Sequence, residues 1–168
     1  MSWSEKTNYQ VIFLKNIDAN NLDYMHGIAM HGDLKYPKNF KKYVKKNYGT
    51  IINIIDQRIE KLTPYFLSYT LSKSALGTLT ITSAMKLAPN IRVNAISPGP
   101  TLKNKRQSES HFKKQWKSVL LKKQVDVKNI SETVKFLIKN DNITGEIINV
   151  DSGQRLAWLT PDIINVKE

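Results

Sequence analysis

Gly-Thr-Ile-Ile-Asn-Ile-Ile-Asp, residues 49–56, is the stretch that decides the fold of this 168-residue chain. Its four isoleucines, interrupted only by Asn53, form a β-branched apolar run that is typical of a strand buried on both faces of a parallel sheet. Asp56 ends the run. Because ligands bind beyond the carboxyl ends of parallel strands, the sequence predicts that Asp56 lies at a functional site.

A long helix is predicted to follow this strand, over residues 64–88. Thr63 and Pro64 provide a hydroxyl at the cap and a proline in the first turn. Tyr69 and Lys73 lie four residues apart and therefore share a face of this helix. The apolar residues expected to form a broad buried stripe are Leu67, Leu71, Ala75, Leu76, Leu79, Ala84 and Leu87.

Asp56, Tyr69 and Lys73 together form a candidate proton-transfer unit. A free phenol has a pKa of about 10, which is too high for efficient proton exchange near neutral pH. A lysine ammonium one helical turn away favours the phenolate and so lowers the pKa of the tyrosine. Asp56 is then placed to orient the hydroxyl or to relay its proton. The alternative for the pair is an amphipathic helix with a lysine on its surface.

A second buried strand is predicted at residues 91–96, Ile-Arg-Val-Asn-Ala-Ile. With the intervening helix, the two strands form a right-handed crossover unit. Residues 131–138 open with Ser-Glu-Thr-Val, which predicts a short capped helix. Residues 22–44 have a helical pattern interrupted by two glycines and a proline, and residues 11–14 are too short an apolar run to assign.

Composition limits the class of protein. The length suits one domain, residues 1–168, with its core at about 45–158. The absence of cysteine excludes disulfides and thiolate chemistry. Neither a membrane span nor a signal peptide is predicted, so the expected location is the cytoplasm. His26, His31 and His111 lack metal-ligand spacing, and no metal site is predicted.

A net charge of +12 suggests nucleic-acid binding as an alternative function. Local clusters of lysine lie at residues 38–46 and 113–123. Apolar residues interleave with the lysines at helical spacing in both clusters, which favours solvated helix faces instead. These apolar residues are Phe40, Tyr43 and Val44 in the first cluster and Trp116, Val119 and Leu120 in the second.

Three motifs, in this order, resemble the short-chain dehydrogenase/reductase family: the strand at 49–54, Tyr-x-x-x-Lys, and Ile-Arg-Val-Asn-Ala-Ile-Ser-Pro-Gly at 91–99. Asp56 stands where the family usually has serine, which resembles its pteridine-reductase branch. The resemblance covers about residues 10–158. It implies an α/β fold, the carboxyl-terminal half of a Rossmann-like, doubly wound parallel sheet with flanking helices.

The resemblance also implies an NAD(P)H-dependent oxidoreductase acting on a pteridine or another carbonyl or imine compound, with NADP or NAD as cofactor. Tyr69 would protonate the substrate, Lys73 would lower the pKa of the phenol and hold the ribose, and Asp56 would assist. The turn at 98–101 would pass beside the nicotinamide. The implied cofactor-binding residues are Lys73, Pro98, Gly99 and Thr101.

Later segments have implied roles in the same way. Residues 102–125 would be the substrate loop and its helix, and residues 144–154 the last strand with its turn, where Ser152 replaces a glycine. Residues 156–158 would lie at a subunit interface, which implies a homo-oligomer and makes Trp158 an interface or core residue. The catalytic asparagine of the family would fall on Ala29 or His31, neither of which is asparagine.

The glycine-rich turn that such an enzyme needs for the cofactor diphosphate is absent, because no three of the seven glycines are grouped. The first half of the family fold is absent with it, which would expose an apolar edge of the remaining sheet. Either a separate polypeptide supplies the N-terminal half, or the chain is the product of a split, decaying reading frame. The irregular stretch before Gly49 favours decay.

The leading hypothesis is therefore a short-chain reductase with impaired or no activity as this chain alone. A second hypothesis is a catalytically silent interaction module that associates with a full-length reductase. The third is the lysine-rich nucleic-acid binder.

Overall fold

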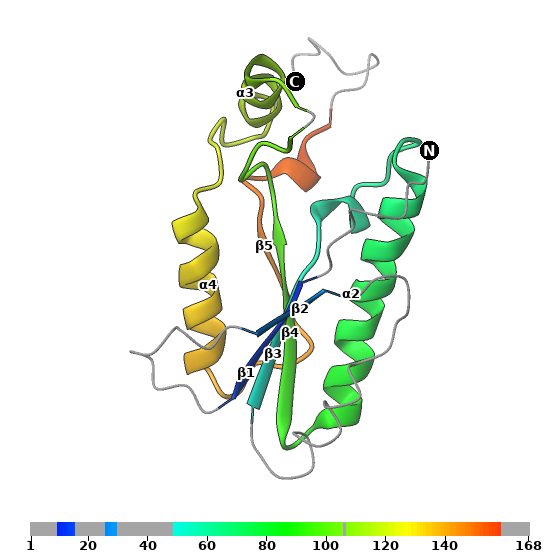
Figure 1. Cartoon of the computed structure of the whole chain (residues 1–168), viewed down its shortest axis with the longest axis vertical. Helices are drawn as coiled ribbons and strands as arrows, with labels where there is room; N and C mark the ends of the chain where they lie inside the picture. Colours follow the sequence, from blue (N-terminus) through cyan, green and yellow to red (C-terminus); the bar gives the residue numbers. More distant parts are fainter. Residues whose placement is uncertain (1–9, 16–25, 30–48, 106, 159–168) are drawn as a thin grey trace, which may run out of the picture.

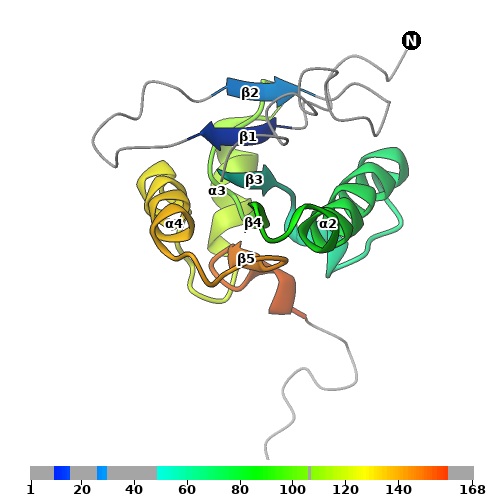
Figure 2. The ribbon, with the colours of Figure 1, turned by 90° about the horizontal axis from the view of Figure 1, so that it is seen from below.

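The computed structural model describes residues 10–15, 26–29, 49–105 and 107–158. The described residues form a layered α/β structure, with one central sheet and a helix layer on each face (Figure 1). Figure 2 shows helices α2 (Leu67–Leu87) and α4 (Val127–Lys139) on opposite sides of the sheet.

The sheet has five strands in the order β2-β1-β3-β4-β5. Strands β3 (Gly49–Ile54), β4 (Ile91–Pro98) and β5 (Ile147–Val150) are parallel. The two crossover connections contain α2 and α4, one on each face, which is the doubly wound arrangement. The predicted fold class is therefore confirmed.

The other two strands were not predicted. Strand β1 (Gln10–Lys15) pairs antiparallel with both β3 and β2 (His26–Ala29). The helix predicted across 22–44 is wrong at 26–29, which is extended, and the rest of that range lies outside the described residues. The predicted open edge of β3 is also wrong, because β1 pairs along it. Of the two candidates for the catalytic asparagine position, Ala29 ends β2 and His31 is outside the described residues.

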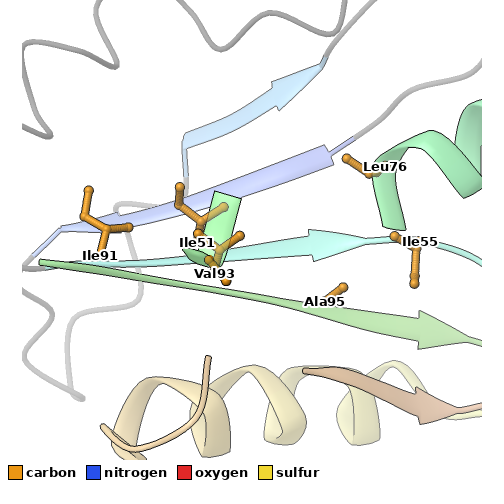
Figure 3. Close-up of a cluster of buried hydrophobic side chains, with 7 residues drawn as sticks. Ile51, Ile55, Leu76, Ile91, Val93 and Ala95 are labelled. Atoms are coloured by element: carbon orange, nitrogen blue, oxygen red, sulfur yellow. The ribbon is translucent and has the colours of Figure 1, made fainter. Parts of the chain in front are cut away.

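The buried run of isoleucines is explained by the two helix layers. Ile51 and Ile52 are both 0% exposed, but they belong to different clusters on opposite faces of β3. Ile51 belongs to a cluster with residues of β4 and α2, and Figure 3 shows it beside Val93 in that cluster, whereas Ile52 belongs to a cluster with residues of α4. A strand covered on both faces must be apolar on both faces, so the prediction from the sequence is confirmed.

Helix α2 begins later than predicted. Its N-cap is Phe66, in the left-handed region at φ 61° and ψ 40°, instead of a residue at the Thr63-Pro64 step. The Thr63 hydroxyl is used in a local turn, where it accepts from Tyr65 N at 3.2 Å. The Thr-Pro signal therefore marks the loop that precedes the helix.

The buried face of α2 is also different from the predicted stripe. Leu76 and Ala84 are buried, but Leu67 and Leu71 are 71% and 62% exposed. Small and polar residues occupy much of the face that meets the sheet, and this allows close approach. The buried residues of α2 are Thr70, Lys73, Leu76, Gly77, Thr80, Ser83 and Ala84.

Helix α4 lies in the C-terminal part of the described residues. Its cap is Asp126, whose carboxylate accepts from Lys128 N at 2.8 Å, so the predicted start at Ser131 is wrong. The Arg92 guanidinium, from β4, donates to the carbonyl oxygens of residues 137, 138 and 143 at 2.8–3.2 Å and so provides hydrogen-bond donors to the carbonyl groups at and after the C-terminal end of α4.

Helix α3 (Glu109–Lys117) ends before Val119, so the second lysine cluster is not one helix face. Among the helices of the described residues, none is both long and apolar enough to cross a membrane.

Candidate functional site

Asp56 and Tyr69 are brought together at the carboxyl end of β3. Asp56 is the N-cap of the short 3-10 turn η2 (Gln57–Ile59), and its Oδ1 accepts from Arg58 N at 2.9 Å. The Tyr69 hydroxyl, from the first turns of α2, donates to Asp56 Oδ2 at 2.7 Å. The carboxylate is thus oriented by the backbone of its own turn and is bonded to the phenol by its other oxygen.

Lys73 lies one helical turn further into the site. Its side chain is buried, with the residue 6% exposed, and Nζ donates to the backbone oxygen of Ile54 at 2.9 Å. Nζ is 5.8 Å from the centroid of the Tyr69 ring. The alternative of a surface lysine is therefore wrong. Burial lowers the pKa of Lys73, and the negative charge of Asp56 opposes this by raising it.

This arrangement suits transfer of a proton to or from the phenol. The hydrogen bond to the carboxylate favours the protonated hydroxyl, whereas a nearby ammonium favours the phenolate. Asp56 Oδ2 accepts the hydrogen bond of the Tyr69 hydroxyl, and Lys73 Nζ lies near the ring of the same tyrosine. Asp56, Tyr69 and Lys73 therefore meet around a common point, as the sequence predicted.

The turn after β4 lies at the same edge of the sheet, because β3 and β4 are parallel neighbours. Gly99 is fixed there by a bond from its N–H to the Val150 oxygen at 3.0 Å. A Cβ on Gly99 would lie 2.7 Å from backbone atoms of Asp151, so only glycine fits between the two turns. Thr101 bonds back to the Gly99 oxygen at 3.0 Å. Pro98 ends β4.

The predicted substrate loop begins and ends at this turn. Val125 N donates to the Pro100 oxygen at 3.1 Å, and Gln124 Nε2 donates to the Thr101 oxygen at 2.8 Å. Helix α3 lies between these two points and is anchored by the buried Phe112. The loop is therefore attached at both ends beside the candidate site.

Two residues at the site were missed by the sequence analysis. The Arg58 guanidinium lies 4.6 Å from the centroid of the Phe66 ring, which is a cation-π distance. Phe66 precedes Tyr69 by one helical turn, and it is 56% exposed. No spacing rule links the two residues, and Phe66 has a left-handed backbone that the sequence does not predict.

The described residues fit one half of a nicotinamide dinucleotide and not the other. The buried ammonium of Lys73 and the turn at 98–101 lie at the edge where the nicotinamide and its ribose would bind. For the diphosphate, the described part of the chain has no glycine-rich turn leading into a helix beside β3. The neighbouring strand β1 is antiparallel to β3, with Lys15 opposite Gly49. The carboxyl end of β1 therefore lies beside the amino end of β3, away from the candidate site.

Comparison with known proteins agrees with this geometry. A family model described as Enoyl-(Acyl carrier protein) reductase matches residues 10–155. With the parallel sheet and the Tyr-x-x-x-Lys helix, the match defines the class: the chain belongs to the short-chain dehydrogenase/reductase family. The resemblance inferred from the sequence is confirmed.

Particular relatives point to the pteridine-reductase-like branch. The chain is 33% identical over 106 residues to a dihydromonapterin reductase of Klebsiella pneumoniae, covering 63% of this chain and 44% of the relative. Its fold is similar to that of FolM alternative dihydrofolate reductase 1 from Brucella canis complexed with NADP, with a TM-score of 0.68, 49% identity and coverage of 70% and 47%. The equivalent Brucella suis structure gives 50% identity and a TM-score of 0.68. The chain spans less than half the length of these relatives.

Proposed function

We propose that the chain carries the proton-donating and nicotinamide-side residues of an NADP(H)-dependent reductase that acts on a reduced pteridine or folate. The observation that carries the proposal is the 2.7 Å hydrogen bond from the Tyr69 hydroxyl to Asp56, with the buried Lys73 beside the same ring. The cofactor and the substrate class are supported by the relatives, two of which are FolM proteins in complex with NADP.

In the proposed reaction, the bound cofactor supplies a hydride. Tyr69 gives the hydroxyl proton to the substrate atom that gains negative charge, and the Lys73 ammonium stabilises the phenolate that remains. Asp56 holds the hydroxyl in position before transfer. The residues that would hold the nicotinamide and its ribose are Lys73, Pro98, Gly99 and Thr101.

The test is NADPH oxidation with 7,8-dihydromonapterin, followed by absorbance at about 340 nm. The full chain is assayed alone and mixed with a polypeptide that supplies a glycine-rich strand-turn-helix. Turnover is expected to be stronger in the mixture, and Tyr69→Phe is expected to reduce it by about 10²-fold or more. Tyr65→Phe is the matched control, because Tyr65 is 72% exposed. Turnover that survives Tyr69→Phe unchanged would contradict the proposed role.

A second candidate function is association with another reductase subunit without catalysis. It is favoured by exposed apolar residues on one face of α2, where Leu67, Leu71 and Met85 are 71%, 62% and 76% exposed. In this case Leu71→Lys is expected to abolish co-purification with the partner, whereas Tyr69→Phe leaves it unchanged. Turnover lost in Tyr69→Phe with association intact would favour the reductase instead.

A further inference from the structure

The turn that carries Asp56 is tied to the end of β5 by one side chain, Glu60. Glu60 follows η2 and uses both of its carboxylate oxygens. Oε1 accepts from Asn149 Nδ2 at 2.8 Å, and Oε2 lies 2.9 Å from Arg155 Nε. Asn149 belongs to β5, and Arg155 belongs to the 3-10 turn η3 (Gln154–Leu156) that follows it. The turn after β3 is thus connected to the turn after β5.

Arg155 continues this connection to a buried carboxylate. Its Nη1 lies 3.4 Å from Oδ1 of Asp151, a residue that is 3% exposed. The other oxygen, Oδ2, accepts from the backbone N–H of Arg155 at 2.8 Å. The backbone of Asp151 is the surface against which Gly99 lies. The series Glu60, Arg155, Asp151 therefore runs from the η2 turn to the turn proposed to face the nicotinamide.

The connection is better suited to fixing geometry than to stabilising the whole fold. The side chains of Glu60 and Arg155 are 41% and 27% exposed, and an ion pair in contact with solvent contributes little to global stability. The η2 turn has only three residues, so its position depends on contacts with its surroundings. Ile59 provides one of these contacts, since its Cδ1 lies 3.3 Å from where a Cβ on Gly77 would be.

We propose that Glu60 is a positioning residue for Asp56. Through Arg155 it holds the η2 turn, and the Asp56 carboxylate consequently keeps its hydrogen bond with the Tyr69 hydroxyl. The same bridge couples that hydrogen bond to the position of the Gly99 turn. The inference rests on the proposed function, because it concerns the Asp56 and Tyr69 pair.

The experiment uses the full chain labelled with [¹³Cζ]tyrosine, since the ¹³Cζ chemical shift responds to what the hydroxyl binds. The signal of Tyr69 is assigned by its loss in Tyr69→Phe, and Asp56→Ala marks its position when the carboxylate is removed. Glu60→Gln is expected to move the signal toward the Asp56→Ala position. The matched control is Glu132→Gln, which removes a carboxylate from an exposed pair with Lys128. Its signal and melting temperature are expected to equal those of the wild type.

A second variant tests the bridge from its other side. Arg155→Lys keeps the positive charge but removes the guanidinium that meets Glu60. It is expected to move the Tyr69 signal in the same direction as Glu60→Gln. The double variant is expected to move it by less than the sum of the two single shifts, because both changes disrupt the same Glu60–Arg155 pair.

The outcomes separate this inference from the proposed function. A wild-type Tyr69 signal in Glu60→Gln and Arg155→Lys, with Asp56→Ala displaced, would overturn the positioning role and leave the proposed function standing. A signal that Glu132→Gln moves equally would also overturn it. No displacement in Asp56→Ala would show that the carboxylate does not bind the phenol, and both proposals would then fail.

Discussion

Lys73 is an ammonium group inside the protein, beside the ring of a tyrosine. Burial lowers its pKa below the ordinary value of 10.5. Between the pKa of the folded state and 10.5, the unfolded chain therefore binds more protons than the folded chain. The free energy of unfolding must rise with pH across this window, since the cost of burying the charge disappears as the amine loses its proton.

This linkage can be measured with Lys73→Met, which removes the titrating group. Relative to this variant, the wild type is expected to gain stability as the pH rises through the folded-state pKa of Lys73 toward 10.5. Urea unfolding at several pH values measures the difference. Lys86→Met is the control, because Lys86 is an exposed residue of the same helix and the variant should follow the wild type. A difference between wild type and Lys73→Met that is constant with pH would contradict the prediction.

Gly99 is the second residue with a measurable consequence. In Gly99→Ala, the new Cβ would meet backbone atoms of Asp151 at 2.7 Å, and backbone cannot move aside as a side chain can. Overpacking of this kind is expected to reduce the free energy of unfolding by about 1–3 kcal/mol. Gly77→Ala is the comparison, because its Cβ would meet only the ends of flexible side chains, Ile59 Cδ1 at 3.3 Å and Ile147 Cδ1 at 4.0 Å. Equal losses in urea unfolding would contradict the proposed contact.

For single residues, the sequence predicted a position correctly where the spacing along a helix and the type of side chain indicated the same arrangement. Tyr69 and Lys73 share a helix face wherever the helix begins, so an error at its start did not affect their pairing. Phe66 could not be placed, because it has a left-handed backbone that non-glycine residues rarely adopt. Glu60 gave no signal, since its partners lie 89 or more residues away along the chain.

At the scale of single elements, α4 shows how a pattern can mislead about a boundary. Ser-Glu-Thr-Val predicts a cap at Ser131, but Ser131 lies inside the helix and its hydroxyl donates to the Lys128 oxygen at 2.8 Å. The cap is Asp126, because its carboxylate reaches the orphan N–H of Lys128. A serine hydroxyl can cap a helix or bond back to a carbonyl oxygen inside one. The backbone conformation, and not the residue type, decides which of the two Ser131 does.

The two caps can be distinguished by substitution. Asp126→Ala is expected to lower the free energy of unfolding by about 0.5–2 kcal/mol, because it leaves a helix N–H without its partner. Ser131→Ala is expected to change it by less than about 0.5 kcal/mol, as for an exposed helix residue. Thermal or urea unfolding of the two variants provides the measurement. If Ser131→Ala costs more than Asp126→Ala, the helix begins where the sequence pattern placed it.

For the whole molecule, the parallel sheet with one helix on each face could be predicted because it leaves a local mark. Strands covered on both faces are rich in apolar residues, and 51–55 has that character with Asn53 as its one polar residue. In 91–96 four of the six residues are apolar, and Arg92 and Asn94 interrupt them. The antiparallel β1 contains an apolar run at 11–14, but four residues are too few to assign an element, and nothing local shows that they pair antiparallel with β3. The order of strands in the sheet depends on pairing between distant segments, and local sequence patterns do not indicate which segments pair.

This topology has a consequence for cofactor binding by the full chain. Neither the sequence nor the described residues supply a glycine-rich turn, so most of the contacts to a dinucleotide diphosphate are missing. Isothermal titration of the chain with NADPH is therefore expected to give no saturable binding at micromolar concentrations. Saturable micromolar binding would mean that another segment holds the diphosphate.

Strand β5 is last in the sheet order and has only four residues. A strand this short offers few backbone donors and acceptors to a passing molecule, and short outer strands are one way in which proteins avoid stacking into fibrils. The described part of the sheet is therefore poorly suited to growth from its β5 side. If the protein self-associates at high concentration, contacts through surfaces other than β5 are expected to be responsible.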